Sequence, residues 1–114
     1  MKKALTFIFI IIAFTLQFCT SSKRMTASKR MPLTYAANIQ PLMAANCTPC
    51  HFPPKGFKKP YNTYQSVKTD IGEIIARIGK NPDEKGFMPF KHPKLSDSVI
   101  HVFVAWNSDG LLEK

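Results

Sequence analysis

The feature that most constrains this chain is the run Cys47-Thr48-Pro49-Cys50-His51. Two thiols at this spacing can form thioether bonds to neighbouring edges of one porphyrin, because the backbone between them is a short arc. The same arc carries the next imidazole to one axial position of the ring's iron. The run therefore predicts that Cys47 and Cys50 attach one haem c covalently and that His51 ligates its iron.

Two other functions are open to the cysteine pair. A redox dithiol of the thioredoxin kind lies between a buried strand and a long helix. Here residues 40–46 have a helical composition, and residues 53–56 hold two prolines and a glycine, which do not begin a long helix. A closed zinc site needs four ligands, and the only further cysteine is Cys19, in a different kind of segment. Both alternatives are disfavoured by this context.

Met88 is the expected second axial ligand. It stands between Gly86 and Pro89, which favour an irregular and fixed loop that can hold a thioether over the far face of the haem. A thioether favours reduced iron more than a second imidazole does, so we expect a raised reduction potential.

Other side chains can compete with Met88 for the iron. Met43 stands one helical turn before the cysteine run and is expected on the same side of the ring as His51. His92 is close to Met88 in the sequence and is the main substitute, whereas His101 lies in an apolar helical stretch and is expected to be packed or half-exposed. A sixth position open to an external ligand is the remaining alternative.

The first two segments with a helical pattern precede the methionine loop. Residues 38–45 form an apolar stripe that Asn38 can cap. Farther along, Asp70 and Glu73 resemble a capping box, and the segment stops near Gly79. The isoleucines that recur at helical spacing in this second segment are Ile71, Ile74, Ile75 and Ile78.

A third segment follows the methionine loop. Ser96 can cap it and Gly110 follows its end, with Trp106 on the apolar face. Residues 99–104 are rich in β-formers and also fit a strand, so the caps favour the helix. The three segments together predict an all-α fold.

In order and separation, these motifs resemble a small single-haem class I cytochrome c domain over residues 34–114. The matching features are a first helix that runs into the C-x-x-C-H motif, the pair Met88-Pro89, and a last helix that carries Trp106. The chain departs from the family pattern at Phe90, where a second proline often follows.

The resemblance implies a bundle of about three to four helices wrapped round the covalent haem, with His51 and Met88 as axial ligands. It also implies that Arg77, on the middle helix, contacts a haem propionate. A domain of this size gains stability from a covalent cofactor in its core. The loop aromatics expected to line the haem are Phe52, Phe57, Tyr61, Tyr64, Phe87 and Phe90.

Residues 1–18 have the pattern of a bacterial signal peptide. Two lysines precede an apolar stretch that is too short for a comfortable membrane span. Leu16 to Cys19 is similar to a lipoprotein signal, although Phe18 replaces the usual small residue. We therefore expect export to the periplasmic side of a bacterial membrane, with a lipid on Cys19. An uncleaved anchor is the alternative.

Residues 19–33 are rich in Ser, Thr, Lys and Arg, which predicts a flexible basic tether before a single domain. The net charge of the whole chain is +9. Many lysines flank the cysteine run and Met88, which favours an acidic redox protein or oxidoreductase as partner. Export and haem chemistry make a nucleic-acid partner unexpected.

The sequence thus predicts an electron carrier and not an enzyme. A haem-based sensor with a displaceable Met88 is one alternative. A cytochrome subunit fixed beside a larger oxidoreductase is another.

Overall fold

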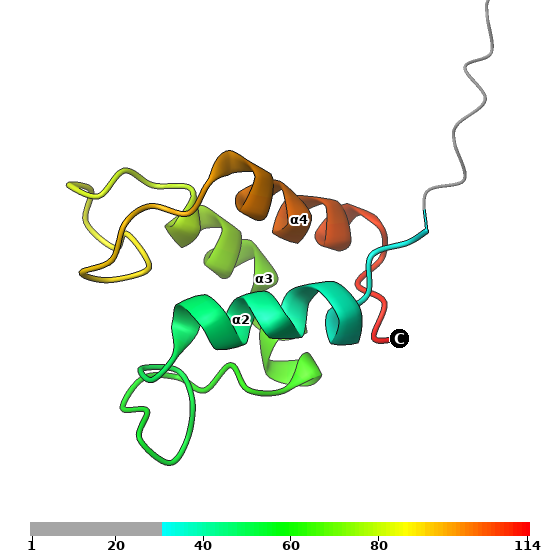
Figure 1. Ribbon diagram of the computed structural model, residues 1–114, viewed down its shortest axis with the longest axis horizontal. Helices are drawn as coiled ribbons and strands as arrows, with labels where there is room; N and C mark the ends of the chain where they lie inside the picture. Colours follow the sequence, from blue (N-terminus) through cyan, green and yellow to red (C-terminus); the bar gives the residue numbers. More distant parts are fainter. Residues whose placement is uncertain (1–30) are drawn as a thin grey trace, which may run out of the picture. The chain divides into compact units, whose positions relative to one another are not determined.

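The computed structural model describes residues 31–114, and this part of the chain is helical, with no β-strand. A π-helical turn, η1 (Tyr35–Ile39), continues directly into α2 (Gln40–Cys47), and α3 (Tyr64–Ile78) and α4 (Asp97–Ser108) follow (Figure 1). The predicted all-α class is therefore confirmed for these residues. The expected signal peptide, Cys19 and tether up to residue 30 lie outside the described residues.

The first helical segment begins earlier than Asn38. Thr34 is its cap, since the Thr34 hydroxyl accepts a hydrogen bond from the amide of Ala37. Asn38 instead accepts a hydrogen bond from the Thr34 amide through its side-chain oxygen. The prediction of an Asn38 cap was wrong because an Asn at this position can bond backward to the turn that precedes it.

Helix α3 also begins earlier than predicted, with its cap about two turns before Asp70. Thr63 and Ser66 form the capping box, and Asp70 lies inside the helix. The isoleucine pattern was nevertheless a correct guide to the buried face, because Ile71, Ile74 and Ile78 are buried. The helix ends at Ile78, as Gly79 predicted.

Helix α4 has the predicted N-terminal cap, Ser96. The Ser96 hydroxyl accepts a hydrogen bond from the amide of Val99, and the helix ends at Ser108, before Gly110. The β-forming stretch 99–104 is helical, because it places Phe103 in the core beside α3.

An aromatic cluster of Tyr35, Tyr64 and Trp106 joins η1, α3 and α4 at one end of the domain. The ring centroids of Tyr35 and Tyr64 are 5.6 Å apart, and those of the other two pairs are 6.1 Å and 6.4 Å apart. Trp106 is fully buried, and its indole nitrogen donates a hydrogen bond of 2.9 Å to the Leu112 carbonyl. This cluster therefore also fixes the C-terminal tail.

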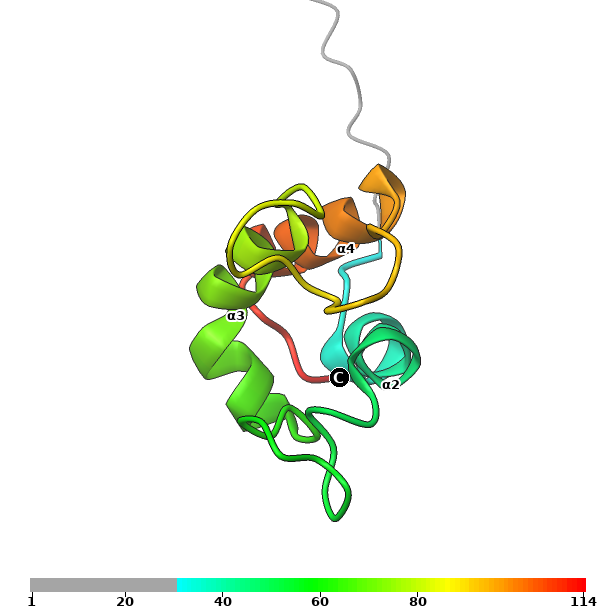
Figure 2. The same ribbon diagram turned by 90° about the vertical axis from the view of Figure 1, so that its left-hand side faces the viewer.

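The tail runs beside the start of η1 (Figure 1). The amides of Tyr35 and Ala36 donate to the carbonyls of Leu112 and Glu113, at 2.8 Å and 3.0 Å. The loops that follow α2 and α3 lie at the other end of the domain, and Figure 2 views the fold from that end. No helix within residues 31–114 has the length and apolar character needed to cross a membrane.

Trp106→Ala is expected to lower the free energy of unfolding by about 3–5 kcal/mol, because it empties the centre of the aromatic cluster and removes the bond to the tail. Val104→Ala is the matched control: Val104 lies on the same helix and is exposed, so its loss should cost less than about 1 kcal/mol. Chemical denaturation followed by circular dichroism measures both. Equal effects would contradict the central role of Trp106.

Candidate functional site

The cysteine run forms a compact turn at the end of α2. Cys47 is the last residue of that helix, and the His51 amide donates to the Cys47 carbonyl at 3.0 Å, so the chain makes one more helix-like turn. The loop then folds back, since the Lys58 amide donates to the Cys50 carbonyl at 3.1 Å. A Cβ on Gly56 would come within 2.8 Å of that same carbonyl, so only glycine fits there. Both thiols are half-buried and unpaired.

The surroundings of Cys47 differ from those of a reactive redox thiol. Burial raises the pKa of its thiol to about 11. The residue also lies at the carboxyl end of a helix, where the helix dipole disfavours a thiolate, whereas redox cysteines lie at helix amino ends. Within residues 31–114 no group of three or more His, Cys, Asp or Glu side chains gathers in a way that could hold a metal ion. These observations favour neither the dithiol nor the zinc alternative.

The His51 ring is held in one orientation. Its Nδ1 lies 2.7 Å from the carbonyl oxygen of Lys59. A carbonyl can only accept, so Nδ1 carries the proton and donates. In a neutral imidazole the lone pair is then on Nε2, which is the form that a metal ligand needs. The Tyr61 ring stacks on His51, with centroids 4.8 Å apart and planes at 20°.

The methionine loop is fastened to the end of α3. The Met88 amide donates to the Arg77 carbonyl at 3.2 Å, and Arg77 Nη1 donates to the Gly86 carbonyl at 3.3 Å. Gly86 has φ of +87°, which other residues rarely adopt, and a Cβ there would approach Arg77 Nη1 to 3.1 Å. Arg77 also donates from Nε to Glu73 at 2.7 Å. The loop conformation therefore depends on Arg77 and on a glycine at 86.

One cavity of about 760 Å³ lies between these segments. Its walls come from the end of α2, the loop after the cysteine run, α3, the methionine loop and α4. The predicted site residues Cys47, Cys50, His51, Arg77 and Met88 all line it. Side chains far apart in the sequence are thus brought to a single space whose volume is typical of a pocket for a large organic ligand.

Two of the three residues that could replace Met88 as iron ligand line the cavity. His92, like Met88, lines the cavity, so it stays an alternative. Met43 also lines it and is fully buried, with its sulfur 3.8 Å from the Cys47 sulfur. His101 is exposed on α4 and is not among the cavity residues.

The expected aromatic lining is correct only in part. Phe57, Tyr61 and Phe90 line the cavity. Tyr64 belongs to the aromatic cluster at the other end of the domain, because α3 begins before the predicted cap. Phe52 and Phe87 are not cavity residues either.

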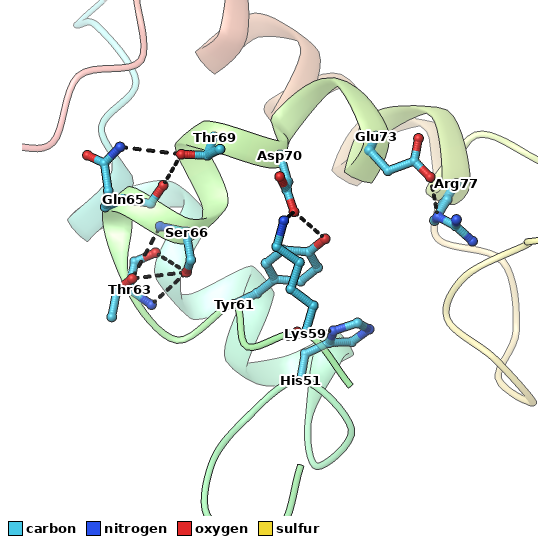
Figure 3. A network of polar contacts seen from close by, with 10 residues as sticks. All are labelled: His51, Lys59, Tyr61, Thr63, Gln65, Ser66, Thr69, Asp70, Glu73 and Arg77. Carbon is cyan, nitrogen blue, oxygen red and sulfur yellow. Dashed lines mark hydrogen bonds and ion pairs between the residues drawn. The ribbon is translucent and has the colours of Figure 1, made fainter. Parts of the chain in front are cut away.

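Asp70 and Glu73, which the sequence suggested as a cap, line the cavity instead. Their spacing with Arg77 along α3 is that of one helix face, so helical periodicity was the signal that could have found them. Each acid is matched by a base: Asp70 pairs with Lys59, and Glu73 with Arg77 (Figure 3). The Lys59 ammonium and the Tyr61 hydroxyl, which both bond to Asp70, lower the pKa of its carboxyl.

The side chains around the cavity include the donor types that a covalent haem would need. Two thiols, an imidazole with Nε2 free to coordinate, a thioether and a guanidinium face one cavity, while Ile74, Ile78 and Phe103 give it apolar walls. The class that fold and site define is an all-α domain with a large, mostly apolar ligand cavity. Models of protein families, curated proteins and solved structures were all compared with the chain, and none of them matches it.

The environment of the Tyr61 phenol predicts how the stability of the fold changes at alkaline pH. Burial, followed by the hydrogen bond to Asp70, raises the pKa of its phenol to about 12 from the ordinary value of 10.0. The unfolded chain loses the phenol proton at a lower pH than the folded chain does. The contribution of the protonated phenol to the free energy of unfolding is therefore complete below pH 10 and is lost as the pH rises toward 12. Stability should therefore fall more steeply over this range in the wild type than in Tyr61→Phe. Denaturation curves at several pH values test this, and parallel curves would refute it.

Proposed function

We propose that this protein is a one-electron carrier that holds a single covalent haem c between His51 and Met88. The observation that carries the proposal is the convergence of Cys47, Cys50, His51 and Met88 on one cavity. The free Nε2 of His51 supports it further, because the Lys59 carbonyl already occupies Nδ1.

Each residue has a defined part in this proposal. The thiols of Cys47 and Cys50 would hold the haem through two thioether bonds, each made by addition of S–H across a vinyl group with no net gain or loss of electrons. His51 and Met88 would ligate its iron. When bound, the haem provides the Fe(III)/Fe(II) couple, which takes one electron from a donor protein and gives it to an acceptor.

The cavity walls combine apolar side chains, among them Ile74, Ile78 and Phe103, with charged ones. Arg77 is available to a propionate because it lines the cavity, although it also holds Glu73 and Gly86. A propionate contact is thus part of the proposal and would add to, or replace, the bond to Glu73.

An acidic redox partner is proposed from the charges near the cavity. Lys58 and Lys59 line it, and Lys91 lies over the ring of Phe90, another lining residue, at 5.4 Å. Positive charge round the electron entry point speeds the approach of an acidic surface and makes the rate fall with salt. The lysines of the two flanking loops are Lys55, Lys58, Lys59, Lys80, Lys85, Lys91 and Lys94. Stable co-purification with one oxidoreductase would instead favour a fixed subunit.

The proposed location is the periplasmic side of a bacterial membrane, with a lipid on Cys19. It rests on the sequence of residues 1–19 alone.

Covalent haem attachment tests the proposal directly. Protein made with haem-maturation machinery should keep its haem under denaturing conditions and show reduced c-type bands. The double variant Cys47→Ala/Cys50→Ala should lose covalent haem completely, because no thiol of the run remains. Thr48→Ala is the matched control: it changes an exposed residue inside the same run and should keep the haem. Wild-type protein without covalent haem would end the proposal.

Met88→Ala tests the second ligand. We expect the weak far-red methionine-to-iron absorption to vanish and the reduction potential to fall by a sizeable part of the roughly 0.8 V range that axial ligands control. His92→Ala and the volume-conserving Met43→Leu should keep both signals. Loss of the far-red band in Met43→Leu, or its survival in Met88→Ala, would exclude Met88. A sensor with a displaceable methionine would be favoured if the wild type bound a small external ligand at the iron and Met88→Ala still did so.

A further inference from the structure

A polar cluster behind His51 links the histidine to α3. Lys59 and Tyr61 both contact the His51 ring: Lys59 through its backbone carbonyl and Tyr61 through its stacked ring. The side chains of both reach the same carboxylate, Asp70, in the second turn of α3 (Figure 3). The Tyr61 hydroxyl donates to Asp70 Oδ2 at 2.9 Å, and the Lys59 ammonium pairs with the same oxygen.

We infer that Asp70 is a positioning residue for His51, and that it acts through Lys59 and Tyr61. The inference rests on the proposed function, in which His51 ligates iron, and adds a part that holds the ligand in place. Among residues 31–114, Asp70 bonds to Lys59 and Tyr61 and forms no hydrogen bond with His51 itself, so its effect must pass through those two residues.

The loop that carries these two residues is irregular, so a side-chain anchor can help to hold it in place. Lys59 and Tyr61 flank Pro60, in a loop with no helix or strand of its own between Cys47 and Tyr64. Proline provides no amide hydrogen, so this stretch has one bond fewer with which to fix itself. The Tyr61 amide donates to the His51 carbonyl at 2.9 Å, which joins the loop to the histidine, and the Tyr61 ring packs against the core. Asp70 adds a polar attachment to the rest of the fold, because it belongs to a capped helix whose other face is in the core.

The sharing of one carboxylate couples the two contacts. If Asp70 is removed, the Lys59 carbonyl and the Tyr61 ring both lose the group that fixes them against α3. The hydrogen bond from His51 Nδ1 should then open more often, although the haem stays attached through the two cysteines. The ligand set does not change, but the orientation and basicity of the imidazole become less well defined.

The test is hydrogen exchange at His51 Nδ1 in the reduced haem protein, followed by NMR. Asp70→Ala should exchange this proton about tenfold faster than the wild type, the size expected for loss of about one hydrogen bond. Asp70→Asn keeps one oxygen that can accept from Tyr61, so its rate should lie between the two. Asp83→Ala removes the same charge from an exposed loop outside the cavity and should leave the rate unchanged.

Tyr61→Phe gives an independent reading, because it keeps the stacked ring and the Asp70 charge and removes only the connecting hydroxyl. It should accelerate exchange in the same direction as Asp70→Ala, which separates positioning from a simple change of charge. Wild-type exchange rates in Asp70→Ala and Tyr61→Phe, in protein that carries covalent haem, would overturn the inference and leave the electron-carrier proposal intact. Failure of the wild type to attach haem would overturn the proposed function itself.

Discussion

Burial of Trp106 is the constraint on which the fold depends. This one side chain contacts Tyr35 at the first helical segment, Tyr64 on α3 and the carbonyl of Leu112 in the tail. The domain is small, and the buried apolar side chains of Met43, Ile74, Ile78 and Phe103 also line the cavity. The aromatic cluster holds the helices together at the end of the domain opposite the loops around the cavity.

The sequence was a good guide to the elements and a weaker one to their beginnings. The isoleucines of α3 and the Ser96 cap of α4 were reliable because they combine helical periodicity with a strong capping residue. The start of α3 was missed because Ser66, and not Glu or Gln, completes the capping box with Thr63, while Asp70 and Glu73 presented a more typical pattern. Those two acids have a different role on the cavity wall.

The candidate site was predictable where a short motif determines it. The C-x-x-C-H run and the Met88-Pro89 pair named residues that the structure brings to one cavity. The polar cluster of Lys59, Tyr61 and Asp70 was not predictable, because it depends on how an irregular loop folds back on a helix. No periodic pattern relates a backbone carbonyl at 59 to a carboxylate at 70, and only the three-dimensional arrangement reveals the link.

The pairing of the tail with η1 has a mechanical consequence. The described chain enters at the end of the domain where it also leaves, and the loops around the cavity lie at the other end (Figure 1). A pull on the backbone just before Thr34 therefore acts first on the hydrogen bonds of Tyr35 and Ala36 to the tail, which Trp106 also holds. Since η1 continues directly into α2, any force that passes these bonds reaches the cavity wall at Cys47 along that helix.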